Sequence, residues 1–306
     1  MPEVSVVVPL YNKAGYVERC VGSIRSQTFA DFEVVVVDDG STDTSFADFE
    51  RACAGDARFR LVRQPNGGVS KARNTGIEHA RADVVAFLDA DDEWSPGYLD
   101  AIVALARRHP GAPLLGTAYQ IVQGGTDVHL RQGLFGGVSP VDVHGFFAAW
   151  SRLGGCPLFI GATAARRADL LAIGGFEVGM NLGEELLAFI RLAERGPLAF
   201  DDRPLAIYHL GLAGTLATSP STTAIRNHLK LLAELERQVA LGRCPQAVHR
   251  RWLGLHAGYL MQSGQRAELF SFLIQSPAQF RARQWMAALL ELAGMRGALR
   301  RLMGRA

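Results

Sequence analysis

The chain has 306 residues, a net charge of +2, and a composition of 48% hydrophobic and 20% charged residues. This apolar content is enough for a sizeable core and excludes an extended disordered chain. The near-neutral charge balance argues against a dedicated nucleic-acid-binding protein, and the length fits one large domain, with or without a smaller appendage.

The cysteines and the apolar stretches limit the cellular location. The four cysteines lie far apart and form no C-x-x-C pair, which excludes a zinc ribbon or redox motif and fits a reducing compartment. The first residues run directly into a strand pattern without the basic and apolar regions of a secretory signal. The longest stretches without charged residues, such as 204–225, contain histidine, proline and many small polar residues, so they are poor membrane-spanning helices. We therefore expect a cytoplasmic protein.

Apolar strands alternate with helices over the first 110 residues. The pattern predicts strands over 4–9, 33–38, 59–63 and 83–88, and helices over 14–27, 46–54, 69–79 and 96–108. The strands end about 25–29 residues apart, which is the length of a strand with its crossover helix, and their continuous apolar character indicates a sheet covered on both faces. Right-handed crossovers then give a doubly wound, mostly parallel α/β sheet with a ligand crevice at its carboxyl edge.

The regular alternation of strands and helices ends after residue 110. The pattern there predicts strands over 114–122, 158–165 and 204–209, helices over 168–173 and 183–195, and a glycine-rich, turn-laden stretch over 124–139. Further helices are expected over 223–241, 245–263, 267–275 and 277–303. We therefore expect an α/β domain over residues 1–220 and a C-terminal helical region over 221–306.

An acidic cluster, Asp89-Ala90-Asp91-Asp92, directly follows the fourth predicted strand. Carboxylates this close repel one another, so the cluster is costly unless a cation or ligand lies there. Their hard oxygen atoms suit Mn²⁺ or Mg²⁺, ions that in turn bind phosphate oxygens. The alternative is a solvated acidic turn that caps the next helix.

Two more polar segments follow strand ends. In the segment 38–43, Gly40 permits a tight turn and a carboxylate could accept a hydrogen bond from a nucleobase, although a plain Asx-type turn is the alternative. No phosphate-binding glycine motif is present. Anionic ligand groups would therefore rely on a metal, on Arg73 or Lys71, and on the turn at 66–68, which leads into a helix N-terminus.

Five short motifs occur in the order seen in glycosyltransferase family 2. They are Val8-Pro9-Leu10-Tyr11-Asn12, Ser26-Gln27-Thr28, Asp38-Asp39-Gly40-Ser41-Thr42-Asp43, Asn66-Gly67-Gly68 with Ala72-Arg73-Asn74-Thr75-Gly76, and Leu88-Asp89-Ala90-Asp91-Asp92. The chain resembles this family over about residues 3–210. The resemblance implies a GT-A fold, a nucleotide-sugar donor, a Mn²⁺ or Mg²⁺ cofactor and inversion at the anomeric carbon.

The resemblance also implies roles for individual residues. The nucleotide-sugar site would comprise Pro9, Tyr11, Asn12, Asp39, Asn66, Arg73, Asp89 and Asp91. Within this set Asp39 would read the base, and Arg73 would lie near the base or the diphosphate. The metal would be bound by Asp89, Asp91 and the adjacent Asp92. Residues 1–110 would form the nucleotide-binding half of the domain, and 111–220 the acceptor-side half.

Members of the family place a Gly-Glu-Asp motif before a helix, and its aspartate is the candidate general base. The matching segment here is Gly183-Glu184-Glu185, so Glu185, with Glu184 as the neighbouring candidate, would take that role with one extra methylene. A shift of about 1 Å in a catalytic group can cost on the order of 100-fold in rate. The alternative is that both glutamates only favour the helix N-terminus. His209 is a further metal-ligand candidate, although a lone histidine is more often structural.

The last 26 residues contain a basic amphipathic stretch. Its arginines are Arg281, Arg283, Arg296, Arg300, Arg301 and Arg305. Such a stretch can lie on the inner face of the cytoplasmic membrane, where relatives meet lipid-linked acceptors. It can equally pack on its own domain or on a second subunit of a homo-oligomer.

These observations predict a metal-dependent inverting glycosyltransferase. It would move a sugar from a nucleotide-diphosphate donor, expected to be a UDP-sugar, to a glycan or lipid-linked acceptor during the synthesis of a surface polysaccharide or glycoconjugate. The alternative is a catalytically impaired nucleotide-sugar-binding or scaffold protein of the same fold, which the glutamate at the base position would favour.

Overall fold

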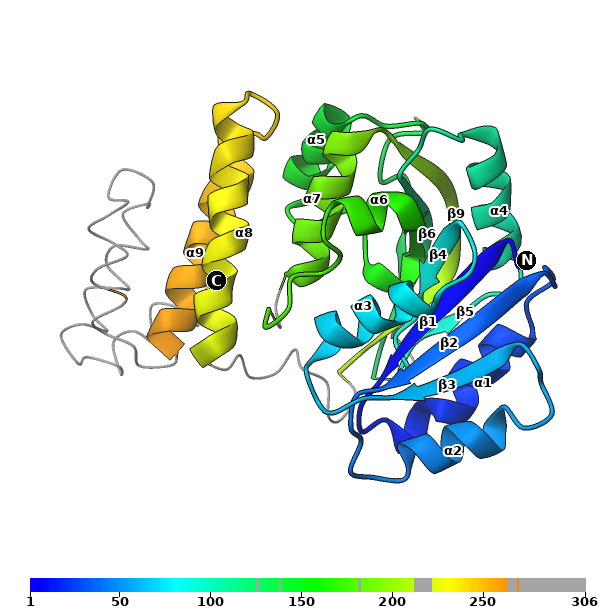
Figure 1. Ribbon diagram of the computed structural model, residues 1–306. Helices are drawn as coiled ribbons and strands as arrows, with labels where there is room; N and C mark the ends of the chain where they lie inside the picture. Colours follow the sequence, from blue (N-terminus) through cyan, green and yellow to red (C-terminus); the bar gives the residue numbers. More distant parts are fainter. Residues whose placement is uncertain (125–126, 138, 181–182, 212–221, 263–268, 270–306) are drawn as a thin grey trace. The chain divides into compact units, whose positions relative to one another are not determined.

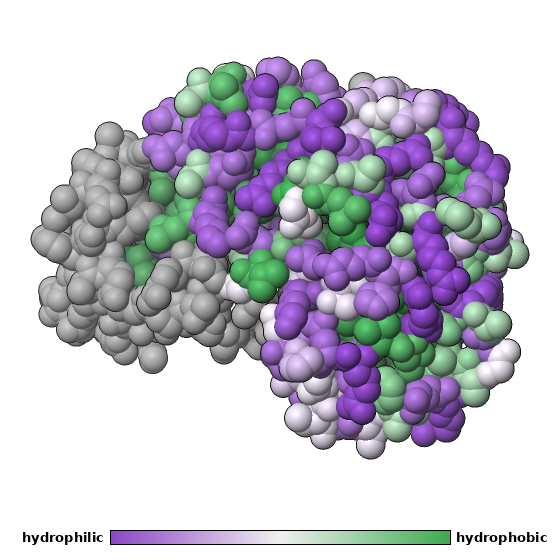
Figure 2. All heavy atoms as spheres, viewed as in Figure 1, coloured by the Kyte–Doolittle hydropathy of each residue, from purple (hydrophilic) through white to green (hydrophobic). Residues whose placement is uncertain are grey.

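The computed structural model describes residues 1–124, 127–137, 139–180, 183–211, 222–262 and 269. The chain divides into two compact units, Met1–Thr218 and Ser219–Ala306. Figure 1 shows the elements of each unit, and Figure 2 shows polar residues over much of the visible face, with apolar residues in scattered groups.

Four parallel strands form the first half of the sheet in the first unit. They are β1 (Val4–Leu10), β2 (Phe32–Asp38), β3 (Phe59–Arg63) and β4 (Val84–Phe87), in the order β3-β2-β1-β4. The connecting helices are α1 (Val17–Arg25), α2 (Ser45–Ala52) and α3 (Val69–His79). α3 covers one face of these strands, and α1 with α2 covers the other (Figure 1). The predicted doubly wound arrangement is therefore confirmed.

Close packing places α3 directly on the sheet. A Cβ atom on Gly76 would lie 2.3 Å from a methyl carbon of Val7 on β1, so only glycine allows this approach. Ala72 of the same helix packs on Val35 and Val37 of β2. As a result, the first turns of α3 are held at the carboxyl edge of the strands.

The sheet continues through strands of both directions. β8 (Thr163–Arg166) pairs antiparallel with β4 and with β6 (Leu114–Gln123). β9 (Leu198–Leu210) runs parallel to β6, and the short β5 (Glu93–Trp94) runs antiparallel to β9. β7 (Asp127–Arg131) pairs antiparallel with β6. The curled sheet thereby brings the segment after β4 next to the end of β9.

The remaining elements surround this second half. They are α4 (Tyr98–Arg108), α5 (Val143–Leu153), α6 (Arg167–Ala172), α7 (Glu184–Arg195) and the 3₁₀ turns η1 (Ala14–Tyr16) and η2 (Ile160–Ala162). The sequence pattern did not predict α5, β5 or β7, and it predicted a single strand where η2 and β8 lie. The strand predicted over 204–209 starts later than β9, because the charged residues 201–203 interrupt the apolar pattern. The register between β6 and β9 shifts near this point.

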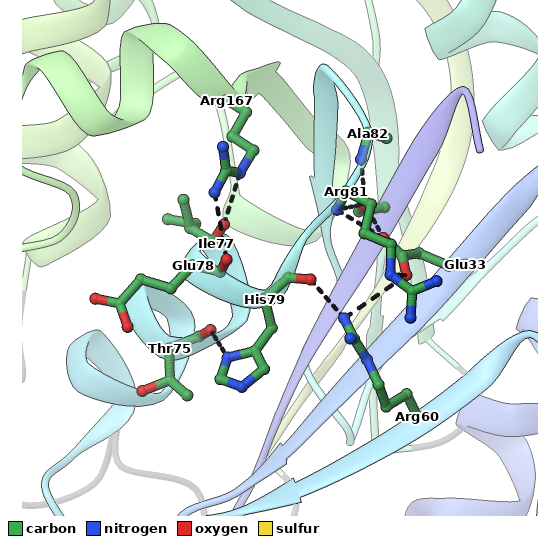
Figure 3. A network of polar contacts seen from close by, with 10 residues as sticks. Glu33, Arg60, Thr75, Ile77, Glu78, His79, Arg81, Ala82 and Arg167 are labelled. Carbon is green, nitrogen blue, oxygen red and sulfur yellow. Dashed lines mark hydrogen bonds and ion pairs between the residues drawn. The ribbon is translucent and has the colours of Figure 1, made fainter. Parts of the chain in front are cut away.

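A buried carboxylate joins the amino ends of the parallel strands (Figure 3). Glu33 on β2 accepts hydrogen bonds from the Ser5 hydroxyl at 2.8 Å and the Arg81 backbone N–H at 2.7 Å. The guanidinium groups of Arg60 and Arg81 lie 3.7 and 3.5 Å from its other oxygen. This network links β1, β2 and β3 with the turn before β4, at the edge of the sheet away from the acidic cluster.

The second unit contains α8 (Thr222–Ala240) and α9 (Gln246–Gln262), which pack on each other. Their buried side chains include Leu231, Leu235, Val248 and Leu253. The helix predicted over 277–303 and its basic residues lie outside the described residues. Among the described helices, none combines the length and the apolar character needed to cross a membrane.

Candidate active site

The loop after β1 is fastened to the loop after β2. Asn12 adopts a left-handed conformation with φ of 51°, and its backbone N–H donates to the Ser41 hydroxyl at 3.1 Å. The Asn12 side-chain oxygen accepts from the Thr42 N–H at 2.9 Å. Pro9 pairs with β2, and Tyr11 is exposed beside this loop. Asn12 thus shapes the loop that carries Tyr11, and direct binding of a nucleoside by these residues stays a prediction.

Asp39 joins the third and fourth of the five predicted motifs. Its buried carboxylate accepts hydrogen bonds from the Gln64 amide at 2.7 Å and from the N–H groups of Gly67 and Gly68, both at 2.8 Å. The Asn66 amide donates to the backbone oxygen of Asp39 at 3.0 Å. Asp39 therefore orders the loop that leads into α3. Reading of a base by Asp39 stays a prediction.

The carboxylates of the acidic cluster have different partners. Asp89 accepts from Arg73, and Asp91 Oδ2 lies 2.5 Å from Lys13 Nζ. Asp92 is only 1% exposed and accepts from the backbone N–H of His209 at 2.9 Å. Burial, together with the charges of Asp91 and Asp89, raises the pKa of Asp92 well above its usual range. The three side chains thus lie at one edge, as predicted, without converging on one point.

Arg73 connects the acidic cluster to the segment before α7. Its guanidinium is 3% exposed and lies 2.9 Å from Asp89 Oδ1 and 3.0 Å from Glu184 Oε1. The ring of Phe176 covers the guanidinium at 5.4 Å. Burial opposes the charged form, but the charges of Asp89 and Glu184 outweigh it and raise the pKa of Arg73. The residue is therefore an ionic bridge between two motifs that lie far apart in the sequence.

Glu185 lies beside Glu184, the carboxylate that Arg73 holds, and proton transfer by Glu185 stays a prediction. Gly183 precedes α7 with φ of 77°, which places both glutamates in the first turn of the helix. Burial and the charge of Glu184 raise the pKa of Glu185 well above its usual range, and the charge of Arg73 opposes them. Raised carboxyl pKa values next to a charged partner are typical of catalytic bases.

His209 faces Glu93 in this structure. Its Nε2 atom lies 2.7 Å from Glu93 Oε1, while its backbone N–H binds Asp92. A pairing of this kind fits a structural histidine at the β5–β9 junction. Metal ligation by His209 stays a prediction without support from this contact.

The comparisons with known proteins bear on this geometry. The sequence model described as glycosyl transferase family 2 matches residues 5–172, which is more than half of the chain. The chain belongs to glycosyl transferase family 2.

Similar members of the family match about a third of the chain. The uncharacterized glycosyltransferase EpsJ of Bacillus subtilis is 45% identical over 109 residues, which cover 36% of this chain and 32% of that protein. The succinoglycan biosynthesis protein ExoW of Rhizobium meliloti is 44% identical over 104 residues, covering 32% of each. The chain thus matches about a third of the length of these curated relatives.

A solved structure extends the likeness beyond this part. The crystal structure of residues 1–349 of S. aureus TarS with UDP-GlcNAc has a TM-score of 0.65 and 21% sequence identity, covering 98% of this chain and 84% of that one. At this identity the likeness shows the fold, which confirms the predicted GT-A-like architecture.

The carboxylate oxygens of the acidic cluster are the kind of ligand that a divalent cation prefers. Asp89 and Asp91 offer hard oxygen ligands at the end of β4, and Asp91 already pairs with a cationic group, the Lys13 ammonium. Across the described ranges, no group of three or more histidine, cysteine or acidic side chains is arranged to hold a metal ion. Binding at this family's acidic cluster would therefore require Asp91 to leave Lys13.

Replacing Lys13 with methionine is expected to tighten Mn²⁺ binding. The ammonium competes with the ion for Asp91 Oδ2, and loss of an ion pair of this exposure is worth about 1 kcal/mol, or roughly fivefold in affinity. Titration of the ligand-free protein with Mn²⁺, followed by electron paramagnetic resonance, measures the change. Lys230→Met in the second unit is the control, and equal or weaker Mn²⁺ binding by Lys13→Met would contradict the expectation.

Sequence reasoning missed several residues of the site. Lys13, Gln64 and Glu93 all contact predicted site residues, yet none stands out by type or spacing. Lys13 offered one signal, because it directly follows the Tyr11-Asn12 motif. The partners of Gln64 and Glu93 are set by the meeting of distant strands.

Proposed function

We propose that this chain is a metal-dependent inverting glycosyltransferase that transfers a sugar from a UDP-sugar to a hydroxyl group of a glycan or lipid-linked acceptor. The observation that carries the proposal is the Arg73 bridge, which holds Asp89 and Glu184 on either side of one guanidinium. It holds Asp89 and the residue next to the candidate base Glu185 on one guanidinium, and a single displacement at the anomeric carbon requires donor-side and base groups held in place.

Each group of residues has a separate task in this proposal. Glu185 accepts the proton of the acceptor hydroxyl. The ion pair between Glu184 and Arg73 holds the first turn of α7, which carries Glu185, in place. Asp91 and Asp89 would bind the divalent cation, which would neutralise the charge that develops on the leaving diphosphate. Tyr11 and the loop ordered by Asp39 would bind the nucleoside.

The identity of the donor and the acceptor rests on the comparisons. The TarS structures with UDP and UDP-GlcNAc support a uridine nucleotide as the donor. The name of ExoW, a succinoglycan biosynthesis protein, supports an acceptor in polysaccharide synthesis. A cytoplasmic location at the inner membrane face is compatible with such an acceptor, and the predicted basic tail would provide the contact.

Hydrolysis of UDP-sugars tests this function without knowledge of the acceptor. We expect the purified protein to release UDP from at least one member of a UDP-sugar panel when Mn²⁺ is present, and to lose this activity with EDTA. Asp91→Asn should reduce release on the order of 100-fold or more, because a group that stabilises the leaving charge is weakened. Asp31→Asn, on an exposed loop, is the matched control.

The same assay separates the enzyme from the alternative binding or scaffold protein. Tight UDP binding without release or transfer of sugar from any donor would support the alternative. Release that persists in EDTA or in Asp91→Asn would contradict the proposed role of the metal.

A further inference from the structure

Three aromatic rings form a stack next to the candidate site. Tyr119 on β6 lies 5.3 Å from Phe159, with the two rings inclined by 52°. Phe159, in the segment before η2, stacks on Tyr208 of β9 at 4.9 Å and 28°. We call Tyr119, Phe159 and Tyr208 the aromatic stack.

Contacts with the acidic cluster and with β5 hold two members of this stack. Tyr208 directly precedes His209, whose N–H donates to Asp92 at 2.9 Å. On the other side, Trp94 donates from its indole N–H to the Gly161 oxygen at 2.6 Å. A Cβ atom on Gly161 would lie 2.3 Å from the Phe159 ring, so the glycine lets this ring lie against the backbone. The stack and the acidic cluster therefore form one continuous structure.

The stack carries two hydroxyl groups that lack a protein partner. No hydrogen bond of either hydroxyl is found within the described residues, with Tyr119 7% exposed and Tyr208 half-buried. Neither hydroxyl belongs to the fully buried polar atoms without a partner, so both reach solvent and are open to a ligand.

Tyr208 lies beside the acidic cluster. The next residue along β9, His209, donates its backbone N–H to Asp92 at 2.9 Å.

We propose that the aromatic stack is the subsite for the pyranose ring of the donor sugar, with Tyr208 as a specificity-determining residue. Aromatic rings pack on the apolar C–H face of a pyranose, and the free phenol hydroxyls donate to its hydroxyl groups. In a single displacement the transferred ring lies next to the leaving diphosphate, and Tyr208 lies beside the acidic cluster that would hold this diphosphate through the cation. This inference rests on the proposed function.

Calorimetric titration with UDP and with the UDP-sugars that the wild type hydrolyses tests the subsite. Tyr208→Leu should weaken UDP-sugar binding about tenfold and leave the Kd of UDP within about twofold, because only the sugar contacts the stack. Tyr208→Phe retains the ring and should show a smaller loss of the same kind. Gly161→Ala should act like Tyr208→Leu by displacing Phe159, whereas Gly22→Ala, where a Cβ meets nothing within 4 Å, is the control.

The outcomes separate this subsite from the proposed function. Unchanged UDP-sugar affinity in Tyr208→Phe and Gly161→Ala, with only the melting temperature lowered, would make the stack part of the core and overturn the inference alone. Unchanged donor affinity with slower transfer to an acceptor would also overturn it, because the stack would then serve the acceptor. Failure of the wild type to bind UDP and every UDP-sugar would overturn the proposed function itself.

Discussion

Replacement of Arg73 by methionine is expected to abolish sugar release and to destabilise the first unit. The substitution keeps the approximate volume but leaves the carboxylates of Glu184 and Asp89 without their shared cation. Removal of one partner from a buried ion pair costs about 3–5 kcal/mol, because the remaining charge stays buried and unpaired. Urea unfolding measures the stability, and UDP release in the presence of Mn²⁺ measures the activity.

Two variants make this result specific. Arg73→Lys keeps the charge but loses the planar fork that contacts both carboxylates, so it should be stable yet strongly impaired. Arg191→Met breaks the partly exposed pair with Glu177 and should cost no more than about 1 kcal/mol with little effect on activity. Normal UDP release by Arg73→Met would show that the bridge is not needed for the reaction.

Replacement of Glu185 by glutamine is expected to reduce kcat on the order of 100- to 10,000-fold, while the Kd for UDP stays unchanged. The amide is similar in size but cannot accept the acceptor proton. Glu184→Gln is the matched comparison. It weakens the ion pair with Arg73 and should therefore lower stability as well as activity. Full turnover by Glu185→Gln would assign the base to a different group.

The pH profile provides a second readout of Glu185. Burial and Glu184 raise its pKa, so kcat/KM of the wild type should increase as the pH rises through that value and the carboxylate form becomes populated. The folded protein also holds this proton more tightly than the unfolded chain does. The corresponding part of the stability is therefore present at acidic pH and is lost as the pH rises through the folded-state pKa. Glu185→Gln should lack both effects.

The sequence predicted the fold because it depends on local patterns. The first four strands are continuous apolar runs, and parallel strands bring their polar carboxyl ends to one edge. The sequence also contains capping residues for α5, although this helix was not predicted. Asp142 caps its N-terminus by accepting from Gly145 at 2.8 Å, and Gly154 ends it with φ of 68°. β5 left no such signal, since two residues are too few for a periodicity.

The pairing of charges within the site could not be predicted. Arg73 and Glu184 are separated by more than a hundred residues, and only the curled sheet brings them to 3.0 Å. The hydrogen bonds that the Asp39 carboxylate accepts from the Gly67 and Gly68 amides were likewise not predictable, and its role in base recognition stays a prediction. Such contacts depend on which segments the fold brings together and on which polar groups then lie within hydrogen-bond distance of one another.

The Glu33 network at the amino edge of the sheet has a practical consequence. Its hydrogen bonds hold the strand starts together on the side opposite the acidic cluster, so this anchor and the proposed substrate site lie at separate ends of the same strands. Fluorophores, affinity handles or solid supports are therefore best attached through the exposed surface around this end, where they leave the proposed site unobstructed.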